Sequence, residues 1–280
     1  NYFHSIIKNT METRTRENIF RPDLVHLLME ARKGRLHMDE VGGNSSATSS
    51  HKEFAMSLTD EDITAQAVVF IFGGYDTTAK LLAFCSYELA VNPTVQEKLR
   101  EEIDANCQKF NGKIGYEDLS ALKYLDMVLS ETLRIWPPGT FLDRKVVSPF
   151  TIEPEKKDEK PLHLQNGDVI WVPVFALHRD PNYWSNPDTF DPERFNEDNR
   201  GKIIQGTYLP FGLGPRNCIG SRYALLAAKL FMFHLLANFE IVPTEKSKIP
   251  LEICKNNILL LPEHGFWFGL KKRRDLKKTN

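Results

Sequence analysis

The stretch Phe211-Gly212-Leu213-Gly214-Pro215-Arg216-Asn217-Cys218-Ile219-Gly220 decides what kind of protein this chain is. Gly212 and Gly214 permit a tight loop in backbone conformations that other residues avoid, and such a loop can lie flat against a planar cofactor. We expect Cys218 to open a helix, whose free N–H groups and dipole would stabilise a thiolate. Arg216 can bind a carboxylate through a forked, charge-assisted hydrogen bond.

This decapeptide resembles the haem-ligand signature of the cytochrome P450 family. It matches that signature at every defining position, which are Phe211, Gly214, Arg216, Cys218 and Gly220. The rest of the chain agrees with the family in the order and spacing of its motifs. The resemblance is strongest to the microsomal P450s of animals, particularly those of the insect detoxification type.

The resemblance covers essentially all 280 residues but only the C-terminal part of the family fold. It implies a mainly α-helical architecture with a small β-sheet component. Residues 1–280 would form the C-terminal haem-binding part of a single P450 domain, without its N-terminal anchor and first helices. Residues 35–56 are polar and rich in Gly and Ser, which predicts a flexible surface loop.

The cofactor that the resemblance implies is haem b, with its iron bound to the thiolate of Cys218. Arg216 and Arg144 would bind the haem propionates, Arg144 because it matches a family position with that role. The expected cofactor-binding residues are Cys218, Arg216, Arg144, Phe211, Gly212 and Gly74.

A second motif, Gly73-Gly74-Tyr75-Asp76-Thr77-Thr78, lies inside a predicted long helix. Two adjacent glycines in a helix interior cost about 1 kcal/mol each relative to alanine, which a helix widened over a bound ligand would explain. Thr77 lies four residues after Gly73, so its hydroxyl can bond that carbonyl. On the residues alone, a tolerated glycine pair is an equally good interpretation. The resemblance favours Asp76 and Thr77 as the catalytic residues that relay protons.

A third motif is the pair Glu131 and Arg134, which lie at i and i+3 on one face of a predicted apolar helix. A buried ion pair needs further polar partners, and the candidate is Arg194. The resemblance implies a Glu–Arg–Arg network that shapes the haem-side core and takes no part in the chemistry. We expect His178 to be a structural hydrogen-bonding residue and not an iron ligand.

Three apolar segments resemble substrate-contacting parts of the family, and they imply a lipophilic substrate. Core packing is an equally good interpretation for each of their residues. The segments are Val69–Phe72, Pro138–Leu142 and Ile258–Leu260.

Hydrophobic periodicity predicts a mostly helical chain with a minor sheet. Helices are expected at 24–31, 59–91, 93–103, 116–122, 125–136 and 218–238. Short strands are expected within 145–173, with a turn at Asn166-Gly167. The tail predicts a hairpin of Ile258–Leu260 with Phe266–Phe268.

Composition excludes several classes of protein. A net charge of −1 gives no global electrostatic case for binding nucleic acid. The four cysteines are scattered, which argues against a disulfide framework or a zinc site. The most apolar stretch, 67–90, is interrupted by charged residues such as Asp76 and Glu88, so we do not expect it to span a membrane.

The function that the resemblance implies is a haem-thiolate monooxygenase that inserts one oxygen atom of O2 into a lipophilic small molecule, either a xenobiotic or an endogenous lipid or hormone. Electrons would come from NADPH through cytochrome P450 reductase, with cytochrome b5 as a further donor. The implied location is the cytosolic face of the endoplasmic reticulum membrane. Arg222 and Lys229 are candidate reductase contacts, although an exposed helix face explains them equally well.

Two alternatives stay open. One is a hydroperoxide isomerase or dehydratase on the same scaffold, which would need no reductase. The retained Asp76-Thr77 pair and the uninterrupted loop before Cys218 argue against it. The other is a truncated, non-catalytic haem-binding product, and we expect residues 1–280 alone to bind haem weakly or not at all.

Overall fold

The computed structural model describes residues 2–33, 58–110, 114–257 and 259–273. It divides into two compact units, Asn1–Asp76 and Thr77–Asn280. Each unit is a body with its own core, and one long helix, α3 (Asp60–Val91), passes from the first unit into the second. The predicted flexible loop at 35–56 lies outside the described residues.

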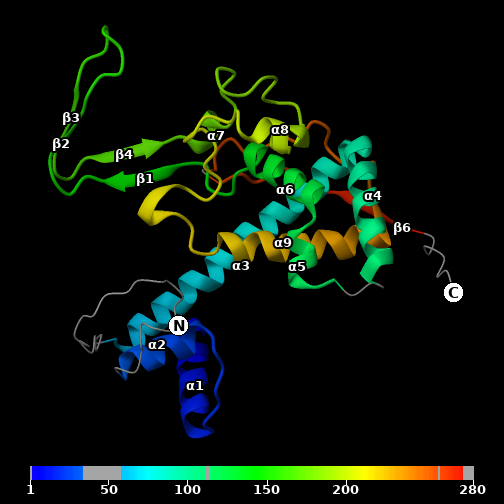
Figure 1. Ribbon diagram of the computed structural model, residues 1–280. Coiled ribbons are helices and arrows are strands. Elements are labelled where there is room, and N and C mark those ends of the chain that lie inside the picture. Colours follow the sequence, from blue (N-terminus) through cyan, green and yellow to red (C-terminus); the bar gives the residue numbers. More distant parts are fainter. Residues whose placement is uncertain (1, 34–57, 111–113, 258, 274–280) are drawn as a thin grey trace, which may run out of the picture. The chain divides into compact units, whose positions relative to one another are not determined.

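The first unit contains α1 (Tyr2–Arg16), α2 (Leu24–Arg32) and the beginning of α3 (Figure 1). The predicted helix at 24–31 is confirmed, and the side chain of Asp23 caps it by accepting a hydrogen bond from the His26 N–H. Five buried side chains form the small core of this unit: Ile7, Met11, Met29, Ile63 and Ala67.

Helix α3 begins and ends where the sequence predicts. Its N-terminus is closed by a reciprocal cap, because the Asp62 N–H donates to Thr59 Oγ1 at 3.1 Å and the Thr59 N–H donates to Asp62 Oδ2 at 2.9 Å. By length and composition this helix could cross a membrane, with a mean hydropathy of 1.3 over its most apolar window. Its last turns, however, carry the buried polar residues Ser86 and Glu88 into the core of the second unit.

The second unit is mostly helical, and the helices predicted from the sequence are confirmed there. Its helical elements are α4 (Pro93–Phe110), α5 (Tyr116–Ser120), α6 (Lys123–Ile135), α7 (Val174–Leu177), η2 (Pro192–Phe195), α8 (Glu197–Arg200), η3 (Gly214–Arg216) and α9 (Ser221–Asn238).

A long two-stranded ribbon occupies the region where short strands were expected (Figure 1). Strand β1 (Leu142–Lys145) pairs antiparallel with β4 (Val169–Val172), and β2 (Phe150–Ile152) pairs with β3 (Leu162–Leu164). The expected turn at Asn166-Gly167 is present, with Gly167 at φ +99°. It interrupts one arm of the ribbon and does not join two paired strands.

The predicted hairpin at the end of the chain is wrong in its pairing. Strand β6 (Phe268–Lys272) pairs with β5 (Phe239–Pro243), the strand that directly follows α9. Between them, Ile253 and Pro262 form an isolated antiparallel bridge. Local apolar patterns identified strand-forming residues but not their partners, because strand pairing depends on contacts far apart in the sequence.

Helix α6 lies at the centre of the second unit and is buried on nearly every side, as an apolar helix in a core should be. Its first free N–H groups are satisfied by α4, since the carboxylate of Glu102 accepts hydrogen bonds from the N–H groups of Tyr124 and Leu125 at 2.8 and 3.0 Å. Pro137 and Pro138 end it.

One face of this helix carries a buried ion pair. Glu131 and Arg134 are both fully buried, and Arg134 Nε and Nη2 donate to the two carboxylate oxygens at 2.7 and 2.8 Å. Arg134 Nη1 also donates to the His178 carbonyl at 2.8 Å. Glu131 Oε1 in turn accepts from the Asp191 N–H at 2.9 Å and from Arg194 Nε at 3.3 Å. The structure therefore brings together the three residues of the expected network.

His178 extends this network toward the loop that contains Cys218. Its Nδ1 lies 3.1 Å from the Arg134 carbonyl, and its Nε2 accepts from the Leu209 N–H at 2.7 Å. This pattern requires the neutral ring with the proton on Nδ1. Burial lowers the pKa of His178 to about 4, so the residue is a structural hydrogen-bonding group, as expected.

The first prediction concerns the buried ion pair. Arg134→Met should lower the free energy of unfolding by about 3–5 kcal/mol, because Glu131 is left buried without its main partner. Urea unfolding followed by circular dichroism measures the change. The matched control is Lys123→Met, which breaks the exposed pair with Glu197 and should leave the stability almost unchanged. Equal losses in the two variants would contradict the prediction.

The second prediction concerns pH. Between pH 6.5 and about 4 the unfolded chain binds a proton at His178 and the folded protein does not. Stability from this residue is therefore complete above pH 6.5 and should decline by up to about 3 kcal/mol as the pH falls through that window. His178→Gln should show a correspondingly weaker pH dependence in urea unfolding. The exposed-residue control His234→Gln should keep the parent slope, and an unchanged slope in His178→Gln would refute the idea.

Candidate functional site

The loop before Cys218 has a shape that only its glycines allow. Gly212 and Gly214 adopt φ values of +75° and +77°, in the left-handed region that other residues avoid. A Cβ atom on Gly212 would lie 3.6 Å from Asn217 Cα. The Cys218 N–H donates to the Phe211 carbonyl at 2.7 Å and closes the loop.

Cys218 does not open the following helix, which corrects the expectation from the sequence. Helix α9 begins at Ser221 with Gly220 as its N-cap, because a bend at Asn217 and a turn at residues 219–220 come first. Cys218 Sγ nevertheless lies beside the helix start, 4.0 Å from the position that a Cβ on Gly220 would take. The absence of a side chain at Gly220 therefore leaves room beside the thiol.

Cys218 is the cysteine whose thiol can reach a ligand. It is exposed, whereas Cys85 is buried and Cys107 and Cys254 are partly buried. Burial raises the pKa of Cys85 to about 12, which makes that thiol inert. Cys218 therefore supplies the loop with an accessible sulfur atom that can bind a metal, close to the N-terminal end of α9.

Two exposed guanidinium groups lie on the elements that meet at this loop. Arg144 is on β1, and Arg216 is in η3. Strand β1 approaches the loop through Leu142, whose two Cδ atoms would lie 3.9 Å from a Cβ on Gly212. Neither arginine forms an ion pair with a carboxylate of the described residues, so both can bind an acidic group of a ligand.

The Gly73–Thr78 motif lies within the continuous helix α3. Asp76 and Thr77 are exposed, and Gly74 has no atom within 4 Å of where a Cβ would be. Asp76 ends the first unit and Thr77 begins the second. The structure therefore places both residues on α3, and their role at the Cys218 site stays a prediction.

The apolar segments expected to contact a substrate differ in burial. Val69–Phe72 is exposed, so core packing within the described residues does not explain it. In Pro138–Leu142 the side chains are partly buried or exposed. Leu259 is exposed, Leu260 is buried, and Ile258 lies outside the described residues.

The expectation that Lys229 contacts a reductase is wrong. Lys229 is buried, and its Nζ lies 2.9 Å from Asp126 Oδ1 on α6. Lys229 therefore connects α9 to α6 inside the protein. Hydrophobic periodicity alone could not distinguish such a buried lysine from an exposed one. Arg222, on the same helix, is exposed.

Sequence reasoning missed a second buried polar cluster around Glu88. The carboxylate of Glu88 accepts hydrogen bonds from Trp136 Nε1 at 2.7 Å and Asn92 Nδ2 at 3.1 Å. The signal that could have revealed it is a lone glutamate in an otherwise apolar helical stretch, which had been interpreted only as a break in hydrophobicity.

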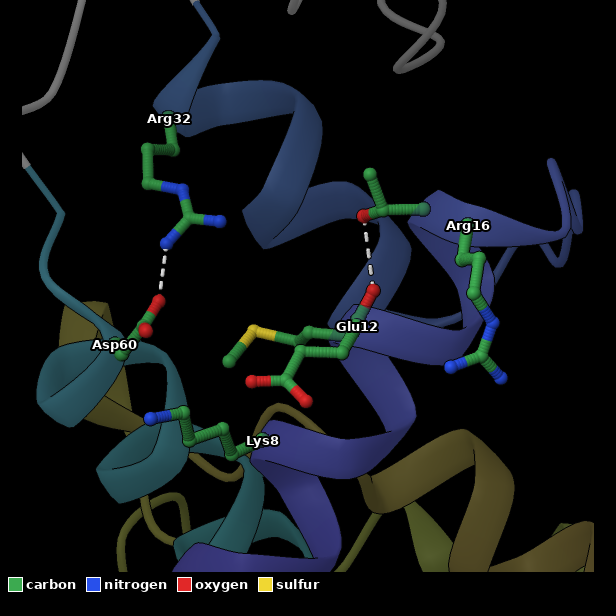
Figure 2. Close-up of a pocket in the computed structure, with 7 residues that line it drawn as sticks. Lys8, Glu12, Arg16, Arg32 and Asp60 are labelled. Carbon is green, nitrogen blue, oxygen red and sulfur yellow. Dashed lines mark hydrogen bonds and ion pairs between the residues drawn. The ribbon is translucent and has the colours of Figure 1, made fainter.

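An open pocket in the first unit contains none of the expected site residues (Figure 2). Its lining mixes charges of both signs, and the Arg32 guanidinium is paired with the Asp60 carboxylate. The lining residues are Lys8, Met11, Glu12, Thr15, Arg16, Arg32 and Asp60.

Comparison with known proteins bears on the family of this chain. A sequence model of the family described as Cytochrome P450 matches residues 1–268. The chain is 44% identical over 272 residues to Cytochrome P450 9e2 of Blattella germanica, a match that covers 97% of this chain and 50% of the relative.

Two further relatives are a probable cytochrome P450 9f2 of Drosophila melanogaster, at 41% identity over 97% of this chain and 50% of the relative, and Cytochrome P450 3A18 of Rattus norvegicus, at 40% over 92% and 48%. The chain thus spans about half the length of the curated relatives it matches. Its helices and small antiparallel sheets are those of a partial P450 fold, and with the family match over residues 1–268 they show that this chain belongs to the cytochrome P450 family.

Proposed function

We propose that this chain is the haem-binding part of a haem-thiolate monooxygenase that inserts one oxygen atom of O2 into a lipophilic small molecule. The observation that carries the proposal is the Cys218 loop, where two glycines with positive φ present an exposed thiol at the start of α9. A glycine loop with one exposed sulfur ligand suits an iron porphyrin better than a compact metal ion, which takes several protein ligands.

The residues around the loop fit a bound haem. Cys218 would supply the thiolate ligand, and Arg144 and Arg216 would bind the propionates with charge-assisted hydrogen bonds. The loop residues Phe211 and Gly212 would also contact the haem, and we propose Gly74 as a further cofactor-binding residue. Bound haem would supply the activation of dioxygen, which a thiolate ligand favours.

The protein's own contribution to the reaction is to position substrate, exclude water and deliver protons. We assign proton delivery to Asp76 and Thr77, adjacent exposed residues on α3. A carboxylate beside a hydroxyl can take a proton from solvent and pass it inward. The same pair favours a monooxygenase over a hydroperoxide isomerase, which needs no proton supply from solvent.

The substrate class follows from the exposed apolar side chains of Val69–Phe72, which would bind a lipophilic molecule. We propose xenobiotics or endogenous lipids and hormones as substrates. We further propose that NADPH-cytochrome P450 reductase supplies the electrons at the α9 side, where Arg222 is exposed, with cytochrome b5 as a second donor. The proposed location is the cytosolic face of the endoplasmic reticulum membrane.

The third prediction tests the thiolate ligand. The reduced full-length protein with carbon monoxide should show the strongly red-shifted Soret band of thiolate-bound haem, and Cys218→Ala should lose it. Cys107→Ala, a partly buried cysteine on α4, should keep it. A band typical of histidine-bound haem in the folded parent protein would remove this mechanism and favour a non-catalytic haem-binding product.

The fourth prediction tests proton delivery. Thr77→Ala should lower the ratio of product formed to NADPH consumed by about 10-fold or more, because electrons still arrive while protons do not. Thr78→Val is the matched control, since the Thr78 hydroxyl is buried and has no hydrogen-bond partner among the described residues. Product analysis with parallel NADPH oxidation measures the ratio. Equal ratios in Thr77→Ala and the parent would exclude Thr77 from the relay.

A further inference from the structure

Glu88 is a buried carboxylate that the proposed chemistry does not use. Only 6% of its surface is exposed, and burial raises its pKa. Burying a carboxylate is costly unless hydrogen bonds compensate. Its strongest partner is the indole of Trp136, whose Nε1 donates to Glu88 Oε1 at 2.7 Å. This bond joins the last turns of α3 to the residue that ends α6.

Trp136 is held by its ring faces as well as by that bond. Its ring stacks on Phe84 with centroids 4.7 Å apart and an interplanar angle of 10°. The guanidinium of Arg179 lies 5.1 Å from the same ring, a cation–π contact. Ring contacts depend little on direction within the ring plane, so the hydrogen bond to Glu88 is the directional contact on the N–H edge of the indole.

Arg179 connects this cluster to α7. It donates a hydrogen bond to the Ile135 carbonyl, and its guanidinium lies 4.1 Å from the Phe175 ring. Burial lowers the pKa of Arg179 to about 10, so the group is still charged at neutral pH. The Phe175 N–H donates to the Thr140 carbonyl at 3.0 Å, which anchors the chain four residues beyond Trp136.

The segment that leaves Trp136 ends against the cysteine loop. The Phe141 ring stacks on Trp171 with centroids 4.4 Å apart. Leu142 follows, and its Cδ atoms reach the space beside Gly212. The segment Pro138–Leu142 is therefore fixed at one end by the Glu88 cluster and at the other by the loop that contains Cys218.

We propose that Glu88 is a positioning residue: by orienting the Trp136 indole it sets where the segment Pro138–Leu142 lies relative to the Cys218 loop, and so determines the room for a ligand at the haem. This inference rests on the proposed function, because it requires haem at Cys218. Glu88 binds Trp136 and Asn92, and it would act on the site through Trp136.

The fifth prediction tests this role in the haem-loaded full-length protein. The probes are imidazole and 4-phenylimidazole, which bind haem iron and differ only by a phenyl group. The readout is the ratio of their dissociation constants, measured by Soret titration. Trp136→Phe keeps the stacking and removes the N–H. It should change the ratio about three- to tenfold, the change in a dissociation constant that corresponds to the loss of one hydrogen bond. Glu88→Met should change it similarly, and Glu88→Gln, which keeps an acceptor oxygen, should stay near the parent value.

The control variant is Tyr208→Phe, which removes a partly buried hydrogen bond to α6, the 2.9 Å bond from the Tyr208 hydroxyl to the Ser130 carbonyl. It should leave the ratio unchanged. If Trp136→Phe binds haem fully and gives the parent ratio, Glu88 has only a structural role and the proposal is overturned. Trp136→Phe decides the question alone if Glu88→Met does not fold. Loss of the thiolate-type carbon monoxide band in the parent would instead refute the proposed function.

Discussion

The buried ion pair of Glu131 and Arg134 is the constraint on which the second unit depends. Two charges without solvent must be satisfied by directed hydrogen bonds, and the available partners come from segments far along the chain. Arg134 holds the carbonyl of His178, and Glu131 holds the N–H of Asp191. His178 then accepts from Leu209, whose carbonyl accepts from the N–H of the first glycine in the cysteine loop. An interaction within one helix thereby fixes a loop that starts about 80 residues later.

A second buried carboxylate, Glu88, binds the residue that directly follows α6. Glu88 meets the indole of Trp136, and Arg179 packs against the same ring. The same physical principle applies to both carboxylates. Removing a charge from water is costly, so the backbone arrangement that satisfies the charge with hydrogen bonds is much more favourable than arrangements that do not. They act on different parts of the chain. The Glu131–Arg134 pair orders the cysteine loop, and Glu88 orders the segment Pro138–Leu142, which leads into β1 beside that loop.

Burial separates groups of the same kind on this chain. Cys85 and Cys218 carry the same thiol, but burial raises the pKa of Cys85 to about 12, while Cys218 is exposed beside a helix start. Lys229 and Arg222 lie on one helix, yet the first is an internal tie to Asp126 and the second is available to a partner. Burial decides which member of each pair can take part in chemistry or recognition.

The sequence by itself determined whatever depends on neighbours in the chain. The limits of α3, the Thr59 cap, the glycine loop and the spacing of Glu131 and Arg134 all follow from local geometry, and the signature around Cys218 identified the family and the candidate ligand. Strand pairing, the true start of α9 and the Glu88 cluster came only from the tertiary structure. The strand pairs and the Glu88 cluster join residues separated by tens of positions. Hydrophobic periodicity records that a side chain is apolar or charged without recording which distant group it meets once water is excluded.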